Sequence, residues 1–330
     1  MESFKSLVFK ILKMVNGFPF RLLYSGDVQI LMFHRIVSDL GDNRIINDGI
    51  EVTEGYLEYL IKFYLEQNYI AISMDQFSKL PKEKSRKKYV VYSFDDGYLD
   101  NLEKALPVFE KYKIPFNVYI PTDFITNKQF AWWYFLEDLL KEEEEIFYKI
   151  NDVEKTIECY EYKDTISAFI LLRSLIQEDP EVLECLITRY PINLSKYYDL
   201  FLNLNQLKLL SSNPLVTIGS HSLSHLSLAK SDDITSYNEV YKSKKELEAM
   251  IQKEVKHFSF PFGTKSDVSI RDISYVKGAG YLTALTTNYG DVHLNQGFDF
   301  FAIPRIWTSE LNKRDELLRS VYGINSYVMR

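Results

Sequence analysis

The sequence predicts an α/β protein in which buried parallel strands alternate with helices. Six short apolar runs have the length and composition of strands that are buried on both faces. Segments with helical periodicity lie between many of these runs, and this alternation indicates a parallel sheet or an α/β barrel. In such folds the chemistry collects at the C-terminal ends of the strands. The predicted strands are residues 28–33, 89–94, 116–120, 216–218, 257–260 and 282–286, and the clearest helices are residues 53–67, 101–112 and 234–254.

The composition is that of a globular protein with a sizeable core. The chain has 330 residues, of which 46% are hydrophobic and 26% charged. Its net charge of -7, without a basic stripe, argues against a general nucleic-acid binder. The two cysteines, Cys159 and Cys185, have no metal-ligand spacing. We expect two free thiols in a reducing compartment, with a disulfide between them as the alternative.

One stretch interrupts the alternation of strands and helices. Residues 130–210 have mostly helical patterns and contain the acidic run 142–145, which is typical of a solvated helix face. We interpret this stretch as an insertion within a single domain of residues 25–330, placed to cover the active site or to bind the rest of a substrate. Trp132 and Trp133 at its start are candidates for stacking on sugar rings, and packing of the insertion against the barrel is the alternative.

The N-terminal segment, residues 1–24, predicts an amphipathic helix. Its apolar residues within 4–15 fall on one helical face, and no run approaches the ~20 apolar residues that span a bilayer. Lys10 and Lys13 interrupt what would be the apolar core of a secretory signal, so we expect no cleavable signal peptide. The expected location is therefore cytoplasmic. The helix would dock on the protein's own core, or residues 4–15 would attach it to the membrane surface.

The first chemical motif is SFDDG at residues 93–97, directly after an apolar run. Adjacent carboxylates at the end of a buried strand, Asp95 and Asp96, repel each other and resist desolvation, so they need compensation, commonly a cation. An Asp-Asp-Gly turn without chemical function is the alternative for this motif alone.

The second motif is HSLSH at residues 221–225, which also follows a short apolar run. The spacing of four predicts that one helical turn brings His221 and His225 to the same side. Two histidines and a carboxylate leave coordination positions open, as in catalytic rather than structural Zn²⁺ sites.

Together the two motifs resemble those of the polysaccharide deacetylase family, also called carbohydrate esterase family 4 or the NodB homology domain. The resemblance covers roughly residues 25–125 and 212–308. It implies a distorted (β/α) barrel, with the mostly helical insertion outside the family pattern. By resemblance Asp95 is the general base, and Asp96, His221 and His225 bind the metal.

The third family motif is met only in part. Residues 258–263 resemble the family strand that ends in Pro-Phe-Gly, which implies that the backbone N–H of Phe262, after Pro261, helps to hold the oxyanion. Tyr98, after the first motif, is a further candidate for substrate contact. Many members carry an Arg before this Pro, but here the position is Ser259. We hypothesise that Arg305, from another strand, takes over the orientation of Asp95.

The general acid is not where the family commonly places it. No Leu-x-His motif lies near the C-terminus. In residues 28–35, however, His34 directly follows an apolar run. This resembles members whose barrel is circularly permuted, with the His-bearing strand moved to the front. A histidine at a strand end can protonate a departing amine because it titrates near neutral pH. His34 is the first candidate for this acid, and His293 is the reserve.

These observations predict a hydrolase that removes N-acetyl groups from an amino-sugar-containing glycan or a lipid-linked precursor in cell-surface glycan biosynthesis. A metal-bound water would attack, with Asp95 as base; O-acetyl removal is chemically close. One divalent ion is expected, Zn²⁺ by default, although Co²⁺, Ni²⁺ or Fe²⁺ would also fit. The alternatives are a non-catalytic carbohydrate-binding protein on the same barrel, and a metal amidohydrolase that acts on another amide, such as a deformylase.

Overall fold

The computed structural model describes residues 25–40, 47–83, 85–151, 153–310 and 314–322. The N-terminal segment predicted to form an amphipathic helix lies outside these residues. Within them, no helix is both long and apolar enough to cross a membrane. Cys159 and Cys185 are both free thiols, as predicted.

Seven parallel strands close into a barrel, which confirms the predicted fold class. The ring closes at β1 (Val28–Phe33), the first strand of the chain, which pairs on one side with β12 (Ile303–Trp307) and on the other with β5 (Lys88–Phe94). A short additional strand, β4 (Tyr69–Ala71), pairs with the N-terminal half of β5 outside the ring. Around the ring the order is β1 (Val28–Phe33), β12 (Ile303–Trp307), β11 (Thr283–Tyr289), β10 (His257–Ser259), β9 (Val216–Ser220), β6 (Phe116–Ile120) and β5 (Lys88–Phe94).

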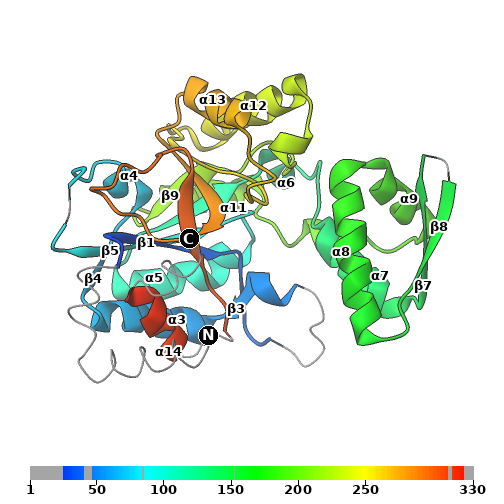
Figure 1. Ribbon diagram of the computed structural model, residues 1–330, viewed down its shortest axis with the longest axis horizontal. Coiled ribbons are helices and arrows are strands. Elements are labelled where there is room, and N and C mark those ends of the chain that lie inside the picture. Colours follow the sequence, from blue (N-terminus) through cyan, green and yellow to red (C-terminus); the bar gives the residue numbers. More distant parts are fainter. Residues whose placement is uncertain (1–24, 41–46, 84, 152, 311–313, 323–330) are drawn as a thin grey trace.

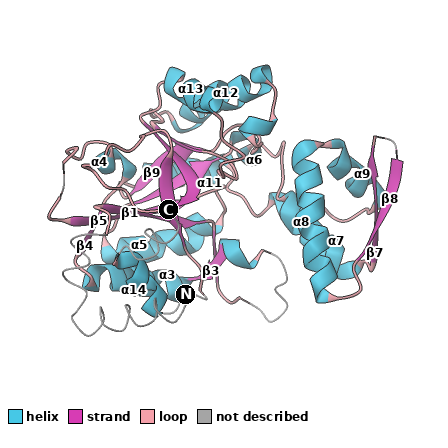
Figure 2. Ribbon diagram, viewed as in Figure 1, coloured by secondary structure: helices cyan, strands magenta, loops and turns pink. Residues whose placement is uncertain are grey.

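Helices cover the outside of the barrel (Figure 2). Alternate residues of each strand point outward into the largest apolar cluster, where helix residues such as Leu60 and Val240 meet strand residues such as Phe94 and Phe258. The covering elements are α3 (Glu54–Glu66), α4 (Met74–Phe77), the π-helix η2 (Asn101–Ala105), α5 (Leu106–Tyr112), α6 (Thr122–Ile125), α11 (Leu204–Ser212), η3 (Leu228–Lys230), α12 (Asp233–Ile251), α13 (Ile270–Gly278) and α14 (Arg314–Val321).

The remaining alternate residues of each strand line the interior of the barrel. Ile30 of β1, Val91 of β5 and Ile303 of β12 share one interior apolar cluster. Because side chains alternate with a period of two, residues at even spacing from these three also face the interior. The register therefore carries His34, Asp95 and Arg305 to the inside.

The insertion lies between β6 and β9 in the chain. In space it forms a lobe beside the barrel (Figure 1). It has its own apolar cluster, which continues to Tyr98 and Phe124 of the barrel. Its elements are α7 (Trp132–Glu142), β7 (Glu145–Ile150), β8 (Val153–Glu158), α8 (Tyr162–Glu178), α9 (Glu181–Arg189) and α10 (Ser195–Tyr198).

Two details of the predicted insertion need correction. The hairpin of β7 and β8 was not predicted, and the acidic run 142–145 is an exposed turn from α7 into β7 rather than a helix face. The predicted boundary at residue 210 is also too late. Leu207 and Leu210 of α11 belong to the apolar cluster of the barrel, because that helix packs on the outside of the ring.

Two short parallel strands, β2 (Arg35–Val37) and β3 (Glu51–Thr53), extend the C-terminal end of β1. A single 3₁₀ turn, η1 (Asp48–Ile50), leads into β3. Arg35 contacts Glu51 of β3 at 3.3 Å and Asp100 at 2.9 Å. These ion pairs fix the segment that directly follows His34.

Candidate metal and catalytic site

Asp96, His221 and His225 converge at the C-terminal end of the barrel. The Asp96 Oδ1 atom lies 3.4 Å from His221 Nε2 and 3.3 Å from His225 Nε2. One ligand atom from each residue fits within 4.8 Å of the others. All three side chains are at most 9% exposed. This donor set, with coordination positions left open, suits a catalytic Zn²⁺ or a similar divalent ion.

The second motif does not bring its histidines together by a helical turn, so that part of the sequence interpretation was wrong. Residues 221–227 form an irregular loop, and Ser222 and His225 have φ angles of 66° and 62°. The loop turns back because the Ser222 hydroxyl accepts the backbone N–H of His225. The two imidazole rings meet edge to face, with centroids 5.0 Å apart.

Backbone strain is concentrated at the site. Asp96 (φ 70°) and Phe262 (φ 58°) join Ser222 and His225 in the left-handed region, which non-glycine residues seldom occupy. Such conformations cost of order 1–3 kcal/mol each and persist where the surroundings over-determine them, often at functional sites. Here they aim two of the three metal-ligand candidates and one backbone N–H.

Hydrogen bonding and charge prepare the cluster for a cation. His221 Nδ1 lies 2.7 Å from the carbonyl oxygen of Ser259. Because a carbonyl oxygen can only accept a hydrogen bond, the proton of the neutral imidazole is on Nδ1, and Nε2 is free to bind a metal. Burial by itself would lower the pKa of His221, but Asp95 and Asp96 outweigh burial and raise this pKa. Asp96 Oδ1 is buried without a hydrogen-bond partner among the described residues. The site therefore attracts positive charge, and a metal would satisfy this oxygen.

Asp95 stands beside the cluster and is held by Arg305. The guanidinium donates from Nη1 to Oδ1 at 2.9 Å and from Nη2 to Oδ2 at 2.7 Å. Arg305 is completely buried, and its Nε donates to the Thr286 carbonyl, which fixes the direction of the fork. The hydroxyl of Ser259, at the position where an Arg is common in the family, is 3.4 Å from Asp95 Oδ2.

The electrostatics keep Asp95 ionised. Burial alone would raise the pKa of its carboxyl, but Arg305 and His221 together outweigh burial and lower the pKa. Its Oδ2 lies 4.0 Å from His221 Nε2, so the carboxylate borders the metal-ligand candidates without belonging to them. This is the position that a base acting next to a bound metal would need.

His34 faces the same interior space and is partly exposed. Burial lowers the pKa of its imidazole, and the charges of Asp96 and Asp95 oppose this only in part. Its backbone carbonyl accepts from Asn101 Nδ2 at 2.9 Å, and the neighbouring Asp100 accepts from the Ile36 N–H. Asp100 and Asn101, at the start of the π-helix, thus place His34, although neither was predicted as a site residue. Single-turn π-helices are frequent at functional sites.

His293 lies at the opposite end of the barrel. Its neighbour Val292 pairs with Val28 at the beginning of β1, whereas His34 follows the end of that strand. The six residues of β1 therefore separate His293 from His34 by roughly 20 Å along the strand. His293 is therefore excluded as the acid for this site.

The backbone N–H of Phe262 lies in a turn at the edge of the site. The hydrogen bond from the Gly263 N–H to the Pro261 carbonyl, 2.6 Å long, tightens the turn. No described residue accepts the Phe262 N–H. The ring of Phe262 packs 4.8 Å from that of His225, and the Arg173 guanidinium of α8 lies 5.5 Å from the Phe262 ring. The insertion thus reaches the edge of the site through Arg173.

Three aromatic residues that the sequence offered as candidates for substrate contact are buried. Tyr98 has no exposed surface, and its hydroxyl accepts the indole N–H of Trp133 at 3.0 Å. Trp132 and Trp133 are 9% and 6% exposed, and the Trp133 ring lies 5.4 Å from that of His225. These side chains join the insertion to the barrel, and the Trp133 ring packs against the metal-ligand candidate His225. The sequence interpretation of all three as substrate contacts is therefore corrected, and the packing alternative holds for the two tryptophans.

A buried carboxylate that the sequence did not point to fixes the histidine loop. Glu239 of α12, 4% exposed, accepts the backbone N–H groups of Leu223 and Ser224 and the Ser224 hydroxyl. It lies 14 positions beyond His225 in the chain, with no motif around it. Only the packing of α12 against the barrel brings it to the loop.

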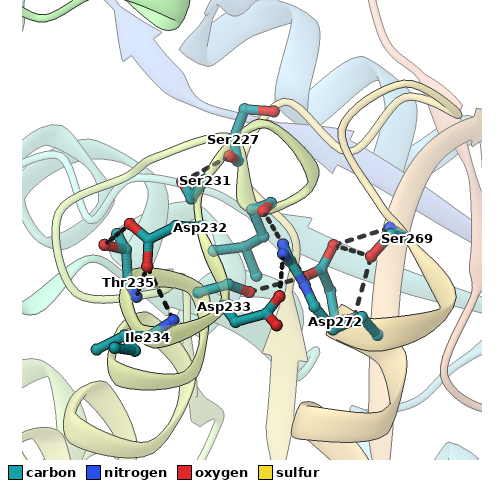
Figure 3. A network of polar contacts seen from close by, with 11 residues as sticks. Ser227, Ser231, Asp232, Asp233, Ile234, Thr235, Ser269 and Asp272 are labelled. Carbon is teal, nitrogen blue, oxygen red and sulfur yellow. Dashed lines mark hydrogen bonds and ion pairs between the residues drawn. The ribbon is translucent and has the colours of Figure 1, made fainter.

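The chain beyond the histidine loop is anchored at the beginnings of α12 and α13 (Figure 3). The Ser231 hydroxyl donates to the Ser227 carbonyl, and Asp232 caps α12 by accepting the N–H groups of Ile234 and Thr235. Arg271 bridges the Leu228 carbonyl to Asp233. These contacts leave little freedom to the segment that follows His225.

We expect the metal-free protein to bind one equivalent of Zn²⁺ in isothermal titration calorimetry. His225→Ala should abolish this stoichiometric binding, because two ligands do not complete a catalytic zinc site. His257→Gln is the matched control, because His257 is also buried but contacts Asp75 and Thr283 at the other end of the barrel. Zn²⁺ affinity unchanged by His225→Ala would remove His225 from the metal site.

Comparison with known proteins places this site in a family context. Residues 82–152 and 168–282, more than half of the chain, match the family model described as polysaccharide deacetylase. A comparison with curated protein sequences gave no match.

Several solved structures share the fold at low sequence identity. A Streptococcus pyogenes deacetylase, PplD, in complex with acetate has a TM-score of 0.58 and 15% identity over 89% of this chain and 97% of that one. A de-N-acetylase from Aggregatibacter actinomycetemcomitans has a TM-score of 0.57 and 12% identity over 89% and 99%. IcaB from Ammonifex degensii has a TM-score of 0.55 and 13% identity over 93% and 99%.

Proposed function

This chain belongs to the polysaccharide deacetylase family, a family of hydrolases that act on glycans, and from that premise we propose that it hydrolyses the N-acetyl group of an amino sugar within a glycan or a lipid-linked glycan precursor. The observation that carries the proposal is the buried Asp95–Arg305 pair directly beside the metal-ligand candidates. A protein that only bound carbohydrate would not need a carboxylate held ionised next to an open coordination site.

In this proposal each side chain has one task. Asp96, His221 and His225 hold a divalent ion, which would polarise the acetyl carbonyl and lower the pKa of a water molecule there. Asp95 accepts the proton of the attacking water, and Arg305 keeps that carboxylate charged and aimed. The backbone N–H of Phe262 donates to the oxygen on which negative charge develops.

The departing amine must receive a proton, and His34 is the group that we assign to this task. It follows the end of β1, which pairs with the strand that ends at Asp95 and Asp96, and its imidazole senses the charges of both carboxylates. Adjacent carboxylates such as these two cannot act as the separated acid pair of a glycosidase, which spans ~5 Å or more across the scissile bond. The geometry therefore favours loss of the acetyl group over cleavage of the sugar chain.

The direct test is acetate release from N-acetylated amino-sugar oligosaccharides and from lipid-linked N-acetylated sugars by the metal-loaded protein. Zn²⁺, Co²⁺, Ni²⁺ and Fe²⁺ should each be added to metal-free protein, because the donor set fits all four. Metal-dependent acetate release from at least one glycan is expected. Activity on formylated or cyclic amides with none on any acetylated glycan would replace this proposal with the amidohydrolase alternative.

His34→Gln should lower kcat on an N-acetylated substrate by about 100-fold, because general acid catalysis contributes on that order. Zn²⁺ affinity should stay unchanged, since His34 is not among the ligand candidates. An activated acetate ester should be hydrolysed nearly as fast as by the wild type, because its leaving group needs no proton. His293→Gln is the matched control and should retain full activity. An unaltered kcat in His34→Gln would end the acid assignment.

A further inference from the structure

Trp307 is the exposed tryptophan of this chain. The protein has three tryptophans; Trp132 and Trp133 are buried, whereas the Trp307 side chain is 55% exposed. Single exposed apolar residues are common on protein surfaces and by themselves indicate nothing. The position and the fixed orientation of Trp307 set it apart.

The register of β12 carries Trp307 to the mouth of the barrel. Ile303 contributes to the interior cluster and Arg305 reaches Asp95, so the same alternation directs Trp307 toward the interior side. It is the last residue of its strand and pairs in register with Met32, two residues before His34. Trp307 therefore stands at the C-terminal end of the barrel, where the metal-ligand candidates also lie.

Thr287 connects Trp307 to the Phe262 turn. The indole N–H of Trp307 donates to the Thr287 carbonyl at 2.8 Å, and the Thr287 hydroxyl donates to the Phe262 carbonyl at 2.6 Å. The Phe262 ring in turn packs on His225. This continuous path makes Trp307 part of the rim of the site and holds its ring in one orientation.

More than half of the Trp307 surface is exposed to solvent. Among the described residues no other aromatic ring packs on Trp307. A largely exposed tryptophan whose polar N–H is already hydrogen-bonded suits a partner with one apolar face and polar edges. A pyranose ring has this character, since its axial C–H groups form an apolar face and its hydroxyls lie around the edge.

We propose that Trp307 forms a sugar subsite, on which a neighbouring pyranose ring of the glycan stacks while the acetylated sugar lies at the metal site. The strand order supports a subsite on a separate side of the mouth, because β12 lies across the ring from β6, where the insertion begins. This inference rests on the proposed function and adds a substrate class to it. The enzyme should prefer an oligosaccharide to the corresponding monosaccharide.

The test compares the wild type with Trp307→Ala on an N-acetylated amino sugar and on an oligosaccharide of the same sugar. For the oligosaccharide KM should rise about tenfold with little change in kcat, since a ring contact of this kind is worth about one order of magnitude in affinity. For the monosaccharide kcat/KM should not change. Trp307→Phe should keep most of the oligosaccharide affinity, because it retains an aromatic face. Leu282→Ala, which removes an exposed apolar side chain at the opposite end of the barrel, is the control.

Fluorescence gives a second readout that does not depend on turnover. In an Asp95→Asn background, the oligosaccharide should change the emission of the exposed Trp307, and this change should disappear in Trp307→Phe. If Trp307→Ala lowered kcat/KM equally for both substrates, or if the fluorescence change survived Trp307→Phe, the subsite would be wrong. If the wild type released acetate from no glycan but oligosaccharide binding still depended on Trp307, the proposed reaction would be wrong and the sugar subsite would remain supported.

Discussion

Asp95→Asn is expected to lower kcat by about two to four orders of magnitude, the usual contribution of a general base. The substitution keeps the shape of the side chain but removes the negative charge that accepts the proton. Zn²⁺ affinity should change little, because Asp95 lies outside the three ligand candidates. The measurement is steady-state acetate release at saturating metal, together with a Zn²⁺ titration of the same preparation.

The control for this variant is Asp75→Asn. Asp75 is also an acidic partner of a histidine, His257, but it lies at the other end of the barrel. That variant should keep wild-type kcat. If Asp95→Asn retained more than about a tenth of wild-type kcat with metal bound, Asp95 would not be the base, since even weak general-base catalysis exceeds that factor.

The strands could be predicted from the sequence because parallel strands buried on both faces are continuous apolar runs. Residues 28–33 and 116–120 were predicted with their final bounds. β12 was not among the predicted runs, because Pro304 and Arg305 interrupt its apolar pattern, even though Arg305 was expected on a strand. The short β4 offers too few residues for periodicity to be recognised.

The candidate site was predictable where local sequence dictates geometry and not where tertiary packing does. Asp95 and Asp96 end an apolar strand, so their position followed from strand alternation. The convergence of His221 and His225 was predicted for a wrong reason, because a helical turn and a loop with left-handed residues can both bring together residues four apart. Exposure could not be read from residue type, so stacking on sugars and packing against the barrel both stayed open for Trp133, while Trp307 received no attention.

The same limit applies to residues that support the site from a distance. Glu239 reaches the histidine loop only because α12 packs against it. Asp100 and Asn101 act through backbone groups near His34 and have no motif of their own. Such contacts depend on how helices settle on the barrel, which a single sequence does not specify.

Arg305→Ala is expected to destabilise the fold and to impair catalysis together. Removing one partner of a buried ion pair leaves the other charge uncompensated, which typically costs about 3–5 kcal/mol in free energy of unfolding. Urea unfolding at neutral pH measures this loss. Arg305→Lys should recover part of it, because lysine restores the charge but not the two-pronged contact with both carboxylate oxygens.

The pH profile of Arg305→Ala distinguishes a positioning role from a purely structural one. In the wild type the pKa of Asp95 is lowered, so the stabilisation from its charge is present above the ordinary aspartate pKa of about 3.9 and is lost as the pH falls through the lowered value. Without Arg305, burial is opposed mainly by His221, and the pKa of Asp95 rises. The acidic limb of kcat/KM should therefore move to higher pH, since protonated Asp95 cannot accept a proton. Arg189→Ala, which removes an arginine from its ion pair with Glu154 on the exposed surface of the insertion, should leave that limb in place. An Arg305→Ala profile identical to the wild type would show that Arg305 does not lower the pKa of Asp95.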